Sequence, residues 1–256
     1  MWFSKLNKLF KKDQTEFEKI KTMLFSHYLR LINIFDFYSG QSDYPVISMN
    51  DVTNFSHQVS ILGTTHIKLA DMDLELIATN VPHHNYLKAE ERNLQRYEFI
   101  EFLVRISLKR YVDPPNKFMT DRVAAIEKLF ETLIYPNAST MNGDVFRKLH
   151  CYQVKTNELL EKNEKVLKQL FTSFCHSKKQ YIRCEEAKAY VRKLGLHISE
   201  IFVGAIYAES MQTIEDTIRV PERVNKMNYV EFLVFLCRIS FWHYEKSKHR
   251  KEERNH

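Results

Sequence analysis

Apolar residues recur every three or four positions along most of the chain, which is the spacing of one face of an α-helix. The longest such stretch covers residues 14–38, and its apolar stripe consists of Phe17, Ile20, Leu24, Tyr28, Leu31, Phe35 and Tyr38. The same spacing predicts further helices over residues 48–61, 69–79, 94–111, 120–135, 144–150, 155–175, 184–194, 198–210 and 227–245. Strand signals are confined to short apolar pairs such as Val46–Ile47 and Tyr181–Ile182. The pattern therefore predicts an all-α fold.

Two of these helical stretches have similar sequences. Residues 97–111 read YEFIEFLVRISLKRY, and residues 230–244 read VEFLVFLCRISFWHY. The earlier helices of the two halves correspond more weakly. A repeat of this length exceeds the unit of a solenoid. It predicts a duplicated four-helix module, with a linker and an extra helix between the halves.

Each half also carries a pattern typical of the EF-hand, in which a hydrophobic loop residue precedes by four positions the carboxylate that begins the exit helix. The matching pairs are Ile47 with Asp51, Leu94 with Glu98, Ile182 with Glu186, and Met227 with Glu231. The chain thus resembles a protein with two EF-hand pairs, over residues 15–111 and 155–245. An unrelated helical bundle is the alternative, because amphipathic helices alone produce part of this pattern.

The resemblance implies five parts along the chain. Residues 1–12 form a basic amphipathic segment, 13–113 the first EF-hand-like module, 114–153 a linker with a helix, 154–245 the second module, and 246–256 a charged tail.

The four loops lack most of the ligands that calcium needs. A calcium loop supplies oxygen ligands at its first, third and fifth places, glycine at the sixth, and a bidentate carboxylate at the twelfth. Counting back from Glu98 gives Leu87, Ala89 and Glu91 at the first three ligand places, with Arg92 at the turn. The other three loops depart from the pattern in the same way. We therefore expect no metal and no cofactor. The retained carboxylates then act as favourable charges at helix N-termini; they are Asp51, Glu98, Glu186 and Glu231.

Charge is concentrated at the two ends. The chain has 38 Lys and Arg against 32 Asp and Glu, but the excess falls within the first and last twelve residues, and the body between them is neutral. This distribution argues against a nucleic-acid-binding surface. The N-terminal segment combines the apolar residues Trp2, Phe3, Leu6, Leu9 and Phe10 with the cations Lys5, Lys8, Lys11 and Lys12. Such a helix binds a partner groove, an acidic surface such as tubulin or, less favourably, an anionic membrane. The alternative is a first helix packed on its own domain.

A second candidate contact surface lies near the end of the last predicted helix. Phe241, Trp242 and Tyr244 follow a stretch that is apolar on nearly every face. A helix of this kind has to be covered on several sides. Either the second module or a partner protein covers these aromatic residues.

Enzyme motifs are absent from the sequence. The five glycines are isolated, so no phosphate-binding P-loop or Rossmann glycine motif can be written. Neither H-E-x-x-H nor G-x-S-x-G occurs. The four cysteines show no C-x-x-C spacing, and no secretory signal or apolar stretch of about 20 residues is present. We expect a non-catalytic cytoplasmic protein.

The degenerate EF-hand pairs, the aromatic-rich helices and the basic ends are together similar to structural components of cilia and their microtubule axonemes. The resemblance implies a structural or adaptor protein of the cytoskeleton that docks onto tubulin or other axonemal proteins. Two alternatives stay open: a calcium-sensing regulatory subunit that binds a target helix, and a peripheral membrane adaptor.

Overall fold

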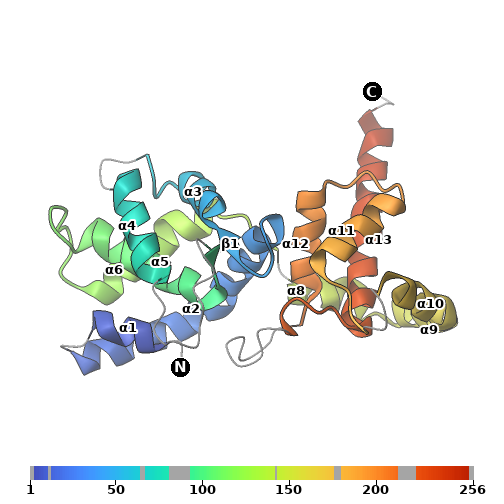
Figure 1. The fold of residues 1–256 in the computed structure, drawn as a ribbon, viewed down its shortest axis with the longest axis horizontal. Coiled ribbons are helices and arrows are strands. Elements are labelled where there is room, and N and C mark those ends of the chain that lie inside the picture. Colours follow the sequence, from blue (N-terminus) through green and yellow to red (C-terminus); the bar gives the residue numbers. More distant parts are fainter. Residues whose placement is uncertain are drawn as a thin grey trace. The chain divides into compact units, whose positions relative to one another are not determined.

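The computed structural model describes residues 3–10, 13–63, 67–80, 93–141, 143–175, 180–212 and 223–253, and the side chains of 3–5 and 246–253 are not described. The described part is helical almost throughout (Figure 1), which confirms the predicted all-α class. The predicted duplication of an EF-hand module stays a prediction.

The chain divides into two compact units. Unit 1 comprises Met1–Tyr38 and Val46–Thr140, and unit 2 comprises Ser39–Pro45 and Met141–His256. Each unit has its own hydrophobic core. The short segment Ser39–Pro45 thus belongs to unit 2 although the sequence on both sides of it belongs to unit 1.

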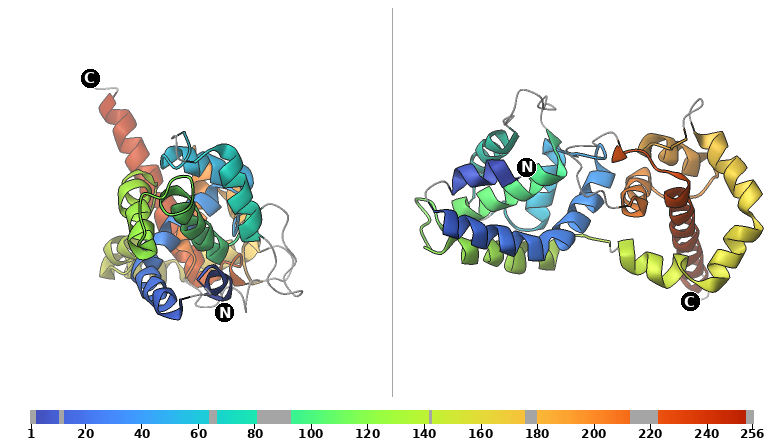
Figure 2. Two further views of the ribbon diagram at one scale, coloured as in Figure 1. Left: turned by 90° about the vertical axis from the view of Figure 1, so that its left-hand side faces the viewer. Right: turned by 90° about the horizontal axis from the view of Figure 1, so that it is seen from below.

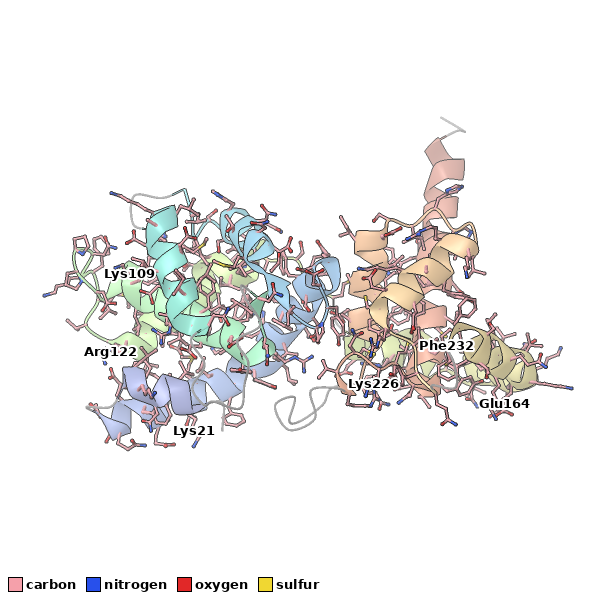
Figure 3. The ribbon with its side chains drawn as sticks, viewed as in Figure 1. Lys21, Lys109, Arg122, Glu164, Lys226 and Phe232 are labelled. Carbon is pink, nitrogen blue, oxygen red and sulfur yellow. The ribbon has the colours of Figure 1, made fainter. Side chains whose placement is uncertain are left out.

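Unit 1 is built around one buried helix. Its elements are α1 (Phe3–Leu9), most of α2 (Gln14–Gln41), β1 (Ile47–Ser48), α3 (Met49–Gln58), α4 (Leu69–Asn80), β2 (Asn93–Leu94), α5 (Arg96–Tyr111), α6 (Arg122–Leu129), the π-helical turn η1 (Phe130–Ile134) and α7 (Tyr135–Asn137). Phe99, Phe102 and Leu103 of α5 are fully buried. Ion pairs join neighbouring helices, Lys109 with Asp71 at 3.7 Å and Arg122 with Glu16 at 3.1 Å (Figure 3).

Unit 2 packs three helices around a second core. Its elements are α8 (Gly143–Phe146), the π-helical turn η2 (Arg147–Cys151), α9 (Val154–Lys162), α10 (Glu164–Phe174), α11 (Cys184–Lys193), α12 (Glu200–Ser210) and α13 (Tyr229–Glu253). Helices α11, α12 and α13 pack together (Figure 2). Phe232 of α13, labelled in Figure 3, and Phe235 are fully buried in this core. The single helix predicted over residues 155–175 is two helices, because Asn163 leaves the helical conformation between them.

The predicted linker over residues 114–153 is wrong, since both of its helical parts are integral to a unit. In unit 1, α6 and η1 contribute fully buried side chains to the core. They are Ala125, Ile126, Leu129, Phe130 and Ile134. In unit 2, α8 and η2 pack against α13. The apolar spacing predicts these helices, but it does not say which surface they cover.

Two glycines allow a close backbone contact within unit 2. A Cβ atom placed on Gly204 of α12 would lie 1.8 Å from the carbonyl oxygen of Gly40, and one placed on Gly40 would lie 2.5 Å from the carbonyl oxygen of Gly204. No side chain larger than hydrogen fits at such distances. The Ser39–Pro45 segment therefore depends on this glycine pair for its place in unit 2.

We predict that Gly204→Ala destabilises the protein. Alanine improves helix propensity by about 1 kcal/mol, but the clash with Gly40 forces a backbone shift that costs more, so the net loss is about 1–3 kcal/mol. Urea unfolding of the full chain measures it. A raised midpoint, as helix propensity alone predicts, contradicts the close approach.

Candidate functional site

The hydrophobic loop residues of the EF-hand-like pattern meet in pairs within each unit. In unit 1, Ile47 and Leu94 are partners in the antiparallel pairing of β1 with β2. In unit 2, Ile182 and Met227 exchange two backbone hydrogen bonds with N–O distances of 3.0 and 2.9 Å. The sequence pattern singled out these four residues, and in the structure they form two antiparallel backbone pairs, one in each unit.

The four loop-end carboxylates each lie in the first turn of a helix and accept a hydrogen bond near its start. The backbone N–H groups of Gln95, Arg183 and Asn228 donate to Glu98, Glu186 and Glu231 at 3.0, 2.7 and 2.8 Å. The Ser48 hydroxyl donates to Asp51 at 2.5 Å. These contacts satisfy groups that a helix N-terminus otherwise leaves free. The carboxylates thus have the helix-start role expected for them.

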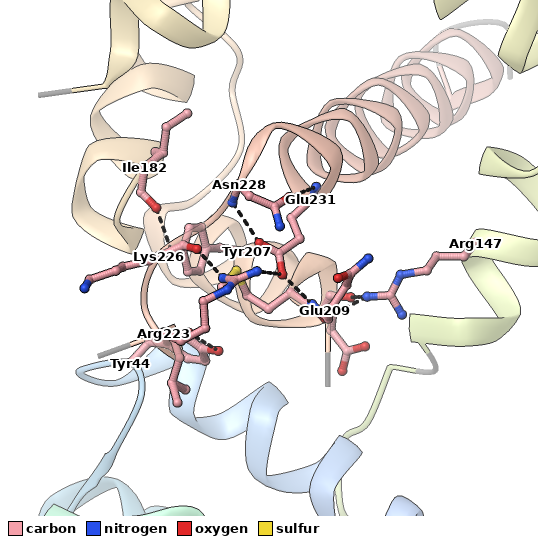
Figure 4. Close-up of polar contacts among 12 residues, drawn as sticks. Tyr44, Arg147, Ile182, Tyr207, Glu209, Arg223, Lys226, Asn228 and Glu231 are labelled. Carbon is pink, nitrogen blue, oxygen red and sulfur yellow. Dashed lines mark hydrogen bonds and ion pairs between the residues drawn. The ribbon is translucent and has the colours of Figure 1, made fainter. Parts of the chain in front are cut away.

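Glu231 has the most enclosed of these environments. Its side chain is completely buried. One carboxylate oxygen accepts hydrogen bonds from the Arg223 guanidinium and from the backbone N–H of Gln212, both at 2.9 Å, and the other accepts from Asn228 (Figure 4). A buried carboxylate is costly unless an opposite charge and hydrogen bonds satisfy it. Arg223 supplies that charge from within the same loop.

Arg223 also binds the loop backbone. Its other terminal nitrogen donates to the main-chain carbonyl of Lys226, so the guanidinium bridges this carbonyl and the Glu231 carboxylate. With Glu231 at the twelfth place of a loop, Lys226 holds the seventh, which gives a backbone carbonyl to the ion in a calcium loop. The guanidinium therefore lies between two oxygens that a calcium-binding loop directs at its ion.

Neutral hydrogen bonds complete the enclosure of this loop. The side chain of Asn225 accepts from the backbone N–H of Cys184 at 3.2 Å and donates to the carbonyl of Tyr44 at 3.3 Å. The Tyr207 hydroxyl donates to the carbonyl of Ile182 at 2.9 Å, and burial raises the pKa of this phenol. Tyr44 in turn donates to the carbonyl of Val224 at 3.1 Å. The loop is thus held by contacts internal to unit 2.

Arg223 was not among the residues predicted from sequence. Counting back from Glu231 gives Val220, Glu222 and Val224 at the first three ligand places, and Arg223 holds the fourth place, which supplies no ligand. The available signal is a basic residue at the fourth place of a loop whose first and fifth ligand places hold valine.

The predicted N-terminal contact surface is corrected by the structure. Leu6 and Phe10 are 1% exposed in the core of unit 1, and Leu9 packs against that core. Their apolar face is therefore used within the chain, as in the alternative of a first helix packed on its own domain. Lys8 is exposed. Trp2, Lys11 and Lys12 lie outside the described residues, as do the side chains of Phe3 and Lys5.

The aromatic residues near the end of α13 divide into two groups. Phe241 packs against Phe146 with a ring-centroid distance of 5.5 Å, and Trp242 packs edge-on against Phe202 at 5.0 Å. Both are therefore covered largely by unit 2. Tyr244 is 66% exposed and is the aromatic side chain of this trio that remains accessible.

Among the described residues, no group of three or more His, Cys, Asp and Glu side chains is arranged to hold a metal ion. Within the same residues, no helix is both long enough and apolar enough to cross a membrane.

Comparison with known proteins found no matching family model, no matching curated protein and no matching solved structure.

We predict that Arg223→Met destabilises the protein by about 1–3 kcal/mol, because the Glu231 carboxylate stays buried without its counter-charge. Arg192→Met is the matched control. Arg192 pairs with Glu200 at 2.5 Å, but both side chains are more than half exposed, so its loss costs less than about 1 kcal/mol.

Urea unfolding of the full chain measures both losses. Adding Glu231→Gln to Arg223→Met should recover part of the stability, since a neutral amide no longer needs a counter-ion. Equal losses for the two arginine variants contradict a special role for Arg223.

Proposed function

We propose that the chain is a non-catalytic, cation-independent scaffold built from two EF-hand-like modules, and that it docks onto partner proteins. The observation that carries the proposal is the Arg223 guanidinium between Glu231 and the carbonyl of Lys226. A calcium sensor needs a loop that loses and regains its ion, because that exchange moves the helices. A guanidinium joined to the loop by covalent bonds cannot dissociate from it.

The pairing of the loop hydrophobic residues supports the EF-hand-like part of the proposal. Ile47 with Leu94, and Ile182 with Met227, are joined across each unit by short antiparallel contacts. Unrelated helical bundles have no reason to join these four residues, which the sequence pattern singled out beforehand.

The partner is an acidic protein surface, and a ciliary microtubule is the specific candidate that the sequence resemblance implies. The predicted charged tail is not separate from the second module, because α13 continues through residue 253. In Figure 1 its last turns extend beyond the other helices of unit 2. The segment contains Lys246, Lys248, Arg250 and Lys251. A basic helix of this kind binds an acidic surface in a salt-dependent way.

Calcium titration of the full chain tests cation independence. We expect no binding heat at micromolar calcium, and no change in tryptophan fluorescence. Micromolar binding would instead support the alternative of a calcium-sensing regulatory subunit.

Co-sedimentation with microtubules tests the partner. Replacing the four basic residues of the α13 end by Gln should weaken binding at least about tenfold at low salt, because four charge contacts are lost. A matched control replaces four exposed lysines on α9 and α10 by Gln and should leave binding unchanged; they are Lys155, Lys162, Lys165 and Lys168.

Equal binding by the two variants would remove the α13 end from the mechanism. Flotation with anionic liposomes distinguishes the membrane alternative, for which lipid binding would follow the same charges. Deleting residues 1–12 is a poor test, because it also removes Leu6 and Phe10 from the core of unit 1.

A further inference from the structure

Two thiols meet in unit 2 where η2 packs against α13. Cys151 of η2 and Cys237 of α13 lie close enough for each side chain to shift the pKa of the other, and neither forms a disulfide. Cys151 is nearly buried and Cys237 is partly exposed. The two sulfur atoms are therefore neighbours, although 86 positions separate them in the sequence.

Contacts on both sides hold this pair in place. Phe241, one helical turn after Cys237, packs on the His150 ring with a centroid distance of 4.6 Å. Arg238 lies over the ring of Phe146 at 4.3 Å and donates to the carbonyl of Gly143 at 2.9 Å. Residues just before Cys151 thus interlock with residues just after Cys237, which keeps η2 and α13 in a fixed register.

Two buried arginines lie near enough to influence the pair by their charge. Arg147 and Arg238 both donate to the carbonyl of Glu209, at 3.1 and 3.2 Å. Arg238 is 1% exposed, and its Nε atom has no hydrogen-bond partner among the described residues. The carboxylates that face this cluster are Glu209 of α12 and Asp144 of α8, and the side chain of Asp144 is largely exposed.

The internal repeat shows how the surroundings of Arg238 differ from those of the equivalent arginine in unit 1. Its counterpart in unit 1, Arg105, forms an ion pair with Glu101 of the same helix at 2.8 Å. The position that corresponds to Glu101 in unit 2 is Val234, and the one that corresponds to Cys237 is Val104. Unit 2 therefore has a thiol and lacks the carboxylate, beside an otherwise similar arginine.

The surroundings distinguish the two thiols. The neighbouring Cys237 side chain lowers the pKa of Cys151 against the opposing effect of burial, and the charges of Arg238 and Arg147 lower it further. The Cys151 side chain and burial both raise the pKa of Cys237. These opposite directions, together with the two arginine charges, make Cys151 the candidate nucleophile, since the thiolate is the reactive form, and Cys237 the candidate resolving thiol.

We propose that Cys151 and Cys237 form a redox-active dithiol, which hydrogen peroxide oxidises to a disulfide that joins η2 to α13. In the first step the Cys151 thiolate attacks one peroxide oxygen, the O–O bond breaks, and the released hydroxide takes up a proton as water. In the second step the Cys237 sulfur attacks the Cys151 sulfenic acid. The S–O bond breaks, and the departing hydroxide takes the Cys237 proton as a second water. The two sulfurs together supply the two electrons that reduce the peroxide.

The remaining two cysteines serve as internal controls. Burial raises the pKa of Cys184 to about 12, and it also raises the pKa of Cys175. Neither is described beside another cysteine or a buried arginine. Both should react with peroxide at least about tenfold more slowly than Cys151, because so little of each is thiolate.

The test is peptide mapping of the full chain by mass spectrometry under non-reducing conditions, after brief peroxide treatment and alkylation in denaturant. We expect a linked peptide pair containing Cys151 and Cys237, two hydrogens lighter than the sum of the free peptides, while Cys175 and Cys184 are alkylated. Oxidation first at Cys175 or Cys184, or sulfinic acid at Cys151 without a link, overturns the proposal.

A variant pair checks the assigned roles. In Cys237→Ser the oxidation should stop at a Cys151 sulfenic acid, which a dimedone probe labels, whereas Cys184→Ser should form the link at the normal rate. Dimedone labelling of Cys184 instead of Cys151 in the first variant contradicts the assignment. The peptide map of the chain without substitutions still tests the proposal if a variant fails to fold. Oxidised protein should also show a higher urea midpoint than reduced protein. The proposal does not depend on the scaffold function.

Discussion

The buried carboxylate of Glu231 is the constraint on which the second unit depends. Its side chain is completely enclosed, and an uncompensated buried charge costs several kcal/mol. Hydrogen bonds to it come from Gln212 just after α12, from Arg223 in the loop, and from Asn228 at the start of α13. Three segments of chain are thus fixed by one anion. Where a calcium loop uses an exchangeable ion for this task, unit 2 uses a side chain of its own.

Unit 1 satisfies its corresponding carboxylates differently. Glu98 accepts from the backbone of Gln95 and from the Tyr97 hydroxyl at 3.4 Å, and Asp51 is held by Ser48. Burial raises the pKa of Tyr97, with the Glu98 charge acting in the same direction. The two halves therefore keep the same residue types at the helix starts while their surroundings diverge. A repeated sequence pattern marks the shared helix starts. It carries no information on which groups satisfy the carboxylate at each start.

The predictable features were local, and the unpredictable ones were tertiary. Capping by Ser48 and the fixed spacing between Ile47 and Asp51 are decided within a few residues, so the sequence pattern located that helix start correctly. The same apolar stripe serves equally well for a core or for a partner, and so the burial of Leu6 and Phe10 could not be read from spacing. Arg223 escaped prediction for a related reason, because its role depends on a carboxylate eight residues away that only the fold brings to it.

The way α13 is anchored bears on the binding that we propose for its basic end. Glu231 fixes the first turn, Arg238 is tied to the carbonyls of Gly143 and Glu209, and Trp242 packs against Phe202. The helix continues without interruption from these contacts to residue 253. A basic segment carried on an anchored helix loses less conformational freedom on binding than a flexible tail of the same charge. Loosening the middle of α13 should therefore weaken partner binding even though no charge is removed. The loss would come from the reduced rigidity of the helix and not from a change in the basic residues at its end.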